Sequence, residues 1–447
     1  MKKSYVVDMT KGNTTKHLIK FAIPMMIGNV LQQLYNVVDS IVVGQYVGDH
    51  ALAGVGSVGS LVFLFMSMCF GVSLGLGIIV SHAFGEGNEE QVKKTIGTSV
   101  YLIGGVGILM SIVGVVFAEP ILVFMRIPAE VMPHALPYMK VMCAGTVFVA
   151  GYNGFSAILR ALGDSKTPLI FLTVAGVLNI FLDLLFVVSF EMGTVGAAWA
   201  TIIAQAVALV GSILFSLKRN SYLLLKKRHL RMDKKILVQC SKIGLPVGCQ
   251  FSFIAVSLVA LQGVVNSFGT VVMAVHTVTV RTEMVIQQPF NAIGAAVATF
   301  SAQNLAVGNV NRAKRAFKKG MMIVAAFSLC SLVVVAFAGR FIVSGFVSNP
   351  EIIDLGARAF TITSLFYLAL GTIYVTRGIL NGAGDGRFAL ISGAVEVFVR
   401  IALSLILTRI PFIGAWGIWW TAALTWTVTA VAGVMRYLKG NWKNIEL

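Results

Sequence analysis

Polar side chains follow one face of the first long apolar segment, residues 17–43. Gln32, Tyr35, Asn36 and Asp39 are spaced i, i+3, i+4 and i+7, which aligns them along one side of a helix. A carboxylate in apolar surroundings can hold a proton or bind a cation. Amide and phenol groups beside it can contact an amphipathic cation through hydrogen bonds and a π face.

A second set of such groups occurs further along the chain. Asn179 and Asp183 share one face of the fifth apolar segment, and Thr201 lies in the sixth. At 1.5 Å per helical residue, Asp39 lies about 7 Å below the outer end of its segment, and Asp183 and Thr201 about 9 Å below theirs. The four side chains are therefore expected at one depth.

The sequence places no fixed cation near these two carboxylates. The first six apolar segments contain no Lys or Arg except Lys20, at the inner end of the first, and Lys140, near the outer end of the fourth. Either one acid is protonated, or a cation binds between them. The alternative is a pair of protonated acids that only hydrogen-bond neighbouring helices. We expect a coupling-ion site for H⁺ or Na⁺, with ligands from Asp39, Asn179, Asp183 and Thr201.

The substrate cavity is expected beside this site. Gln32, Tyr35 and Asn36 should line it, and Asn153 should close its deeper end. Pro24 removes one backbone hydrogen bond from the first helix and gives it a place to bend.

The second half of the chain buries balanced charges. Two acids and two bases, Arg281, Glu283, Glu396 and Arg400, are expected in the middle third of the bilayer. Glu396 and Arg400 form a favourable i, i+4 pair. These four predict a structural ion network, with a direct transport role for Glu283 as the alternative.

Composition defines the elements that carry these residues. Hydrophobic residues make up 57% of the 447-residue chain and charged residues 12%, against about 25% charged residues in soluble domains. Apolar runs long enough to cross a bilayer recur, and strand alternation is absent. We predict an all-α polytopic membrane protein with twelve spans: 17–43, 53–80, 95–118, 136–158, 169–189, 195–217, 236–265, 271–300, 321–338, 357–380, 388–408 and 414–435.

Charge distribution predicts the orientation. The net charge is +17, and most of the 35 Lys and Arg fall in the N-terminus, the C-terminus and alternate loops. This asymmetry indicates that both termini are cytoplasmic. The basic segment 218–235 is expected to determine topology and contact lipid headgroups, rather than nucleic acid.

The two halves repeat each other. ILRALGDSKTPL (158–169) aligns with ILNGAGDGRFAL (379–390), and EGNEEQVKK (86–94) aligns with VGNVNRAKR (307–315), both 221 residues apart. Six spans in each half predict two lobes related by a pseudo-two-fold axis along the membrane normal. We expect lobes at 1–217 and 236–447, joined by the linker 218–235. No Walker A loop and no catalytic motif are present, so neither ATP use nor an enzyme is expected.

These features resemble the multidrug and toxic compound extrusion (MATE) antiporters, in particular the bacterial branch of the DNA-damage-inducible F type and its Gram-positive multidrug relatives. YNVVDS around Asp39, the residues Asn179, Asp183 and Thr201, and Pro24 carry the resemblance. It implies alternating-access export of amphipathic organic cations, such as drugs and dyes, in exchange for H⁺ or Na⁺. Some relatives place a further acid in span 10, which this chain lacks.

The resemblance also sets the remaining expectations. It implies a monomer in the bacterial cytoplasmic membrane that needs no cofactor. The main rival is a lipid-linked saccharide flippase of the same superfamily. Such flippases have more spans and a strongly basic cavity, whereas we expect an acidic one here.

Overall fold

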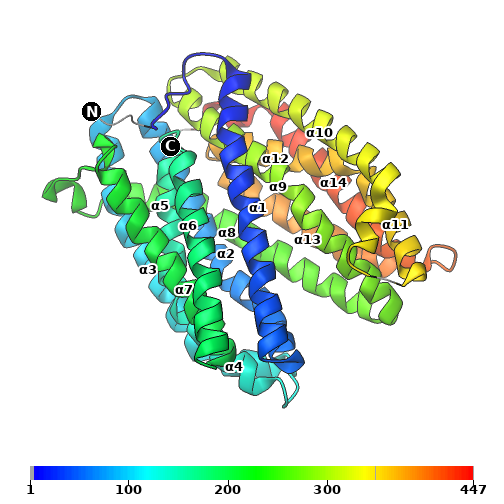
Figure 1. Cartoon of the computed structure of the whole chain (residues 1–447). Helices are drawn as coiled ribbons and strands as arrows, with labels where there is room; N and C mark the ends of the chain where they lie inside the picture. Colours follow the sequence, from blue (N-terminus) through cyan, green and yellow to red (C-terminus); the bar gives the residue numbers. More distant parts are fainter. Residues whose placement is uncertain (1–4, 348, 446–447) are drawn as a thin grey trace. The chain divides into compact units, whose positions relative to one another are not determined.

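The computed structural model describes residues 5–347 and 349–445, and the regular structure in this part of the chain is entirely helical (Figure 1). Short 3₁₀ or π segments, labelled η, separate some of the helices. The elements in chain order are α1 (Thr14–Tyr46), α2 (Asp49–Gly85), α3 (Glu89–Phe124), α4 (Met132–Ala144), α5 (Thr146–Ala161), α6 (Lys166–Asp183), η1 (Leu184–Ser189), α7 (Gly193–Leu217), η2 (Ser221–Leu223), η3 (Lys227–Leu230), α8 (Lys234–Asn266), α9 (Thr270–Ala306), α10 (Val310–Ser344), α11 (Pro350–Ser364), α12 (Tyr367–Gly382), α13 (Gly386–Leu407), η4 (Gly414–Trp416), α14 (Gly417–Lys439) and η5 (Asn441–Asn444).

Each predicted span corresponds to one long helix or to one interrupted helix. Among the described residues, eight helices are long and apolar enough to cross a membrane, and ten when each of two bent pairs is counted as one span. These pairs are α4 with α5, bent by 45°, and α11 with α12, bent by 46°. The helices α1 and α9, of 33 and 37 residues, are also long enough. They are the more polar pair, and they complete the predicted twelve.

The backbone repeats with the same spacing as the sequence. Gly163 and Gly384 both have φ +82°, a conformation that only glycine adopts without a steric penalty. The next residues, Asp164 and Asp385, each cap a helix by accepting a hydrogen bond from the backbone N–H three residues later. Three further glycine pairs with positive φ are 221 residues apart: Gly48 and Gly269, Gly87 and Gly308, and Gly193 and Gly414.

The described chain divides into two compact units. Unit 1 contains the residues up to Met9 together with Pro24–Gly248, and unit 2 contains Thr10–Ile23 and the chain from Cys249 onward. One boundary falls inside α1, directly before Pro24, and the other falls inside α8. The lobes expected at 1–217 and 236–447 stay a prediction.

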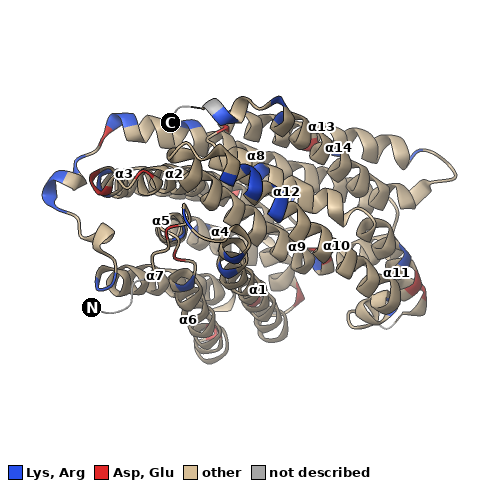
Figure 2. Ribbon diagram, turned by 90° about the horizontal axis from the view of Figure 1, so that it is seen from above, with Lys and Arg blue, Asp and Glu red and all other residues tan. Residues whose placement is uncertain are grey.

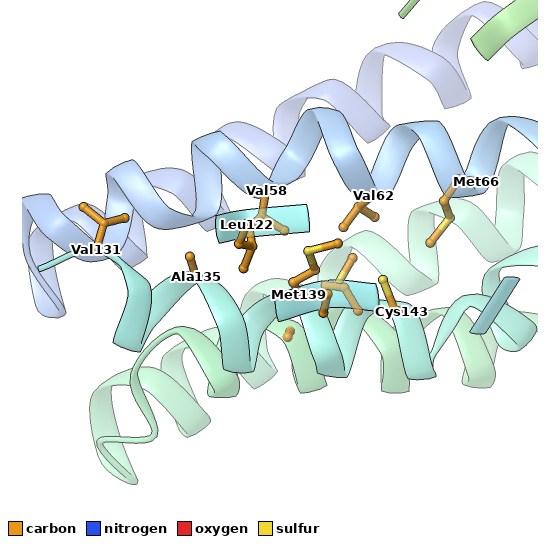
Figure 3. Packing of buried hydrophobic residues seen from close by; sticks show 11 residues of the cluster. Val58, Val62, Met66, Leu122, Val131, Ala135, Met139 and Cys143 are labelled. Atoms are coloured by element: carbon orange, nitrogen blue, oxygen red, sulfur yellow. The ribbon is translucent and has the colours of Figure 1, made fainter. Parts of the chain in front are cut away.

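A sulfur-rich core holds α4 in unit 1 (Figure 3). Met66 of α2, Leu122 of α3, and Met139 and Cys143 of α4 are buried together. Methionine fills irregular gaps between helices because its side chain is unbranched and flexible. Tyr138, next to Met139, packs on this core, so the core also fixes a phenol in unit 1.

Glycines allow α2 and α8 to approach closely within unit 1. A Cβ added at Gly75 would lie 2.6 Å from the carbonyl oxygen of Cys240 and 2.8 Å from the Cα of Gly244. One turn earlier on α2, Gly71 meets Gly248 in the same way. Small residues of this kind let membrane helices associate through backbone contact.

The basic segment 218–235 packs on α3. His229 is buried, its Nε2 lies 3.2 Å from Glu90, and the Tyr101 hydroxyl donates to the carbonyl of Leu230 (2.8 Å). Arg228 also donates to Glu90. Figure 2 shows Lys and Arg in connecting segments and at ends of helices.

Candidate functional site

The predicted coupling-ion residues come together in unit 1. Asp183 is the last residue of α6, directly before the π segment η1, and its side chain is fully buried. Asn179, one turn earlier, is 2% exposed, and its amide lies 3.5 Å from the Thr201 hydroxyl of α7. Asp39 of α1 lies close enough to Asn179, Asp183 and Thr201 to interact with them electrostatically. The structure therefore brings the four side chains together, and their role as an ion site stays a prediction.

The carboxylates in this cluster lack donors. Neither oxygen of Asp183 receives a hydrogen bond from any residue that the structure describes, and the same holds for Oδ1 of Asp39. The described residues also give neither acid an ion-pair partner. Two adjacent carboxylates, one fully and one partly buried, cannot both stay charged at low cost without a positive partner. The arrangement can therefore hold one shared proton, or bind a cation with oxygen ligands.

A phenol missed in the sequence also lies near both acids. Tyr138 of α4 is close enough to Asp39 and Asp183 to feel their charges. Its neighbours on α4 are apolar, and nothing in the sequence spacing linked it to α1 or α6. Met139 and Cys143 of α4 lie in the core (Figure 3), and Tyr138 packs against the same core, a contact that only the three-dimensional structure shows.

Unit 1 also contains a cavity of about 100 Å³, whose lining includes none of the four cluster residues. Gln32 and Asn153 line it, as predicted, together with Pro24. Tyr35 is instead buried against Gly176, and Asn36 is exposed and donates its amide to Gln33 (3.3 Å). Neither of them is among the residues that line this cavity.

The charge of this cavity differs from the expectation. We expected acidic lining, but the lining of the cavity includes neither Asp39 nor Asp183. Its one charged lining residue is Arg160, which forms no ion pair with any described residue. The sequence had assigned Arg160 to the loop after span 4. In the structure it belongs to the last turn of α5, and its side chain lines the cavity.

Unit 2 contains part of the predicted ion network: Glu396 and Arg400 are paired, Arg377 joins them, and neither Arg281 nor Glu283 forms an ion pair with a described residue. Glu396 accepts from Arg400 (2.7 Å) and from Arg377 (2.7 Å), and Arg400 also donates to Ser257 (2.6 Å). Arg377 was missed because the sequence placed it beside the following loop. Arg281 is exposed, and it takes no part in this network of described residues.

Glu283 stands beside this network in a second cavity. The cavity has a volume of about 180 Å³ and is lined by Glu283, Arg377, Glu396 and Arg400 together with aromatic side chains. Glu283 is buried, and its Oε1 receives no hydrogen bond from the residues described. The buried charges of this cavity are two guanidinium groups and two carboxylates, so they balance.

Pro24, the predicted hinge, lies inside α1 at the boundary between the two units. It lines the cavity of unit 1. A proline inside a helix leaves the carbonyl four residues earlier without its backbone donor, so bending there breaks no hydrogen bond.

Comparison with known proteins identifies the family. The MatE family model matches residues 24–185 and 246–406, one stretch in each half. A probable multidrug resistance protein of Bacillus subtilis (strain 168), YpnP, is 30% identical over 447 residues, covering 98% of each chain. Two solved structures, an outward-facing multidrug resistance MATE family transporter and a MOP superfamily transporter from Pyrococcus furiosus, are each 22% identical, cover 100% of both chains and have TM-scores of 0.91.

The fold and the paired family matches define a polytopic membrane transporter with twelve spanning helices. The chain belongs to the MatE family, the multidrug and toxic compound extrusion transporters. It is a multi-pass protein of the bacterial plasma membrane, and its relatives are transporters rather than enzymes. The resemblance inferred from the sequence is confirmed.

Proposed function

We propose that this transporter exports amphipathic organic cations, such as drugs and dyes, in exchange for H⁺ or Na⁺. One observation carries the proposal. Asp39, which is partly buried, and Asp183, which is fully buried, form an acid pair without a fixed counter-charge among the described residues, and three of its oxygens receive no hydrogen bond from them. Such a pair changes its charge whenever a proton or cation enters, so it can couple an ion gradient to a change in the protein. The multidrug resistance name of the relative YpnP supports drugs as the substrates.

The ion and the drug compete in this proposal. An ion that binds to Asp39 and Asp183 neutralises the negative charge that attracts a cationic drug. Linkage then requires that drug affinity fall when protons or Na⁺ bind. Bending of α1 at Pro24 gives the acid pair a way to change its exposure between the drug-loaded and ion-loaded states.

Dye efflux from proteoliposomes tests this proposal. We expect Asp39→Asn and Asp183→Asn each to abolish efflux driven by an imposed H⁺ or Na⁺ gradient, because asparagine cannot change its charge. Asp164→Asn is the matched control. Asp164 is also buried, but it caps α6, and asparagine caps helices equally well. Wild-type efflux in both acid variants would overturn the coupling role.

A lipid-linked saccharide flippase is the second candidate, and Arg160 is the observation that favours it. An unpaired guanidinium in the cavity of unit 1 fits a phosphate or another anionic group better than a cation. Arg160→Gln separates the two candidates. Dye efflux that continues in this variant supports the cation exporter. A wild-type protein that moves no dye, but binds a polyprenyl phosphate through Arg160, supports the flippase.

A further inference from the structure

The two units can be compared residue by residue, because the repeat keeps its register in three dimensions. Residues of α5–α7 match residues of α12–α14 whose numbers are 221 higher, as the glycine and cap pairs establish. Between α1 and α8 the offset is 222, so that Pro24 matches Pro246. A contact confirms this register. A Cβ added at Gly28 would lie 3.2 Å from Leu172, and one added at Gly393 would lie 2.9 Å from Gln250, the same pair of positions in unit 2.

The cavities of the two units are built at matching positions. Residues that line the cavity of unit 1 fall on residues that line the cavity of unit 2. The matching pairs are Tyr152 and Ile373, Asn153 and Tyr374, Ser156 and Arg377, and Gln205 and Trp426.

The acid cluster of unit 1 also has a counterpart, but with different chemistry. Asp39 matches Leu261, Asp183 matches Ser404 and Thr201 matches Ala422. The Ser404 hydroxyl donates to the carbonyl of Ile401 within its own helix. Unit 2 has therefore lost both carboxylates at this position. The remaining pair consists of Asn179 and Arg400.

Arg400 connects the same two helices of the repeat that the acid cluster connects. In unit 1 an ion bound by Asp39 and Asp183 would join α1 to α6. In unit 2, Arg400 of α13 is 4% exposed and donates to Ser257 of α8 (2.6 Å) as well as to Glu396 (2.7 Å). The helices α8 and α13 are the counterparts of α1 and α6. A guanidinium is present in unit 2 at the position where unit 1 has Asn179, beside its two acids.

We propose that Arg400 is a built-in cation, which takes in unit 2 the position that the coupling ion takes in unit 1. Unit 2 therefore needs no exchangeable ion, and its acids stay neutralised throughout transport. Removing the guanidinium converts this position into a site for a small monovalent cation: a proton, Na⁺ or free guanidinium. This inference rests on the proposed ion site in unit 1.

The charges around Arg400 determine the effect of removing its side chain. With Arg400 present, two guanidinium groups balance Glu283 and Glu396, and without it one negative charge is left over in a buried cavity. The helices α8, α11 and α14 contribute no titratable side chain to this cavity. The titratable and charged groups that face it are His276 and Glu283 from α9, Tyr374 and Arg377 from α12, and Glu396 from α13, with the buried hydroxyl of Tyr367 on α12 near Glu283.

Chemical rescue of Arg400→Ala tests the proposal. The variant, purified in detergent, should melt several degrees below wild type. Its melting temperature should rise again at low pH, with Na⁺, or with free guanidinium at low millimolar concentrations, far below those that unfold proteins. Choline chloride at equal ionic strength should not restore it. Arg281→Ala is the matched control, because Arg281 is an exposed arginine in the same unit. It should gain no cation response.

Two further variants keep the test decisive if Arg400→Ala fails to fold. Arg400→Lys keeps a fixed charge and should melt without a gained pH or cation dependence. Asn179→Arg introduces the built-in cation into unit 1, and it should remove the response of wild-type melting to pH and Na⁺. A response in Arg400→Ala that equals the wild-type response, or a wild-type response that persists in Asn179→Arg, would overturn the proposal. If the melting temperature of the wild type does not change with pH or Na⁺, the proposed function is contradicted. The role of Arg400 is still tested in that case, because Arg400→Ala is compared with the wild type under the same conditions.

Discussion

Replacing Glu396 by Gln should destabilise unit 2 strongly. Glu396 is 5% exposed and accepts hydrogen bonds from Arg377 and Arg400, both at 2.7 Å. Glutamine has nearly the same size, but it carries no charge, so two buried guanidinium groups would share Glu283 as their nearest carboxylate. Breaking a buried ion pair by removing one partner costs about 3–5 kcal/mol in free energy of unfolding.

An exposed pair of the same geometry provides the control. Glu89 accepts from Lys93 at 2.6 Å with the same i, i+4 spacing as Glu396 and Arg400, but the Glu89 side chain is 54% exposed. Water screens this pair, so Glu89→Gln should cost about 0.5 kcal/mol for the ion pair. The loss of an acid in the first turn of α3 adds about 0.3–1 kcal/mol.

Thermal melting in detergent measures both variants. At about 2–4 °C per kcal/mol for a unit of roughly 200 residues, Glu396→Gln should lower the melting temperature by roughly 6–20 °C. Glu89→Gln should lower it by a few degrees. Below its melting temperature, Glu396→Gln should still bind dye. Equal melting of the two variants would refute the stabilising role of burial. Wild-type melting together with lost dye binding would assign Glu396 to the substrate instead.

The remaining predictions concern coupling and helix packing. Wild-type dye affinity, measured by fluorescence titration, should fall at low pH or high Na⁺. In Asp39→Asn and Asp183→Asn, dye affinity should be independent of pH and Na⁺. If both variants keep the wild-type sensitivity, the two acids are not part of the ion site. Gly75→Ala should lower stability by about 1–3 kcal/mol, because its Cβ would meet the Cys240 carbonyl at 2.6 Å. Gly56→Ala, in the same helix with nothing within 4 Å, should raise stability by about 0.4–1 kcal/mol in the same melting assay; equal effects of the two would contradict the close approach of α2 and α8.

The sequence predicted the helices and the acid cluster well, for physical reasons. A bilayer leaves no alternative to a helix for an apolar run of this kind, so each span could be assigned by length and hydropathy. Depth along a helix follows from a constant rise per residue, and this placed Asp39, Asp183 and Thr201 at one level. The buried Asn179 donates its amide to the Thr201 hydroxyl, which agrees with the predicted common depth.

Depth alone does not say which way a long side chain points. Arg160 lies in the last turn of α5, which the sequence assigned to a loop, and Arg377 lies near the C-terminal end of α12. An arginine side chain extends over more than one helical turn, and both of these side chains line a cavity. Conversely, the sequence places Arg281 and Asn36 deep within their predicted spans, but both residues are exposed in the structure. The direction around the helix, which depends on the neighbouring helices, decides these cases.

Counting charges in the acid pair leads to an expectation for the stoichiometry of exchange. If the proposed function holds, an empty Asp39–Asp183 pair would hold one shared proton and one negative charge, which balances one monovalent cationic drug. Release of the drug would then require one incoming proton or Na⁺. Unit 2 would contribute no further exchange, because Glu396 accepts from Arg377 and Arg400, and its cavity is lined by two guanidinium groups and two carboxylates. Exchange of a monovalent dye should therefore be electroneutral. In proteoliposomes, efflux should follow the ion gradient, but it should not change when valinomycin and K⁺ set different membrane potentials. A rate that rises with potential at a constant ion gradient would mean that more than one ion enters for each drug, and that a second site takes part.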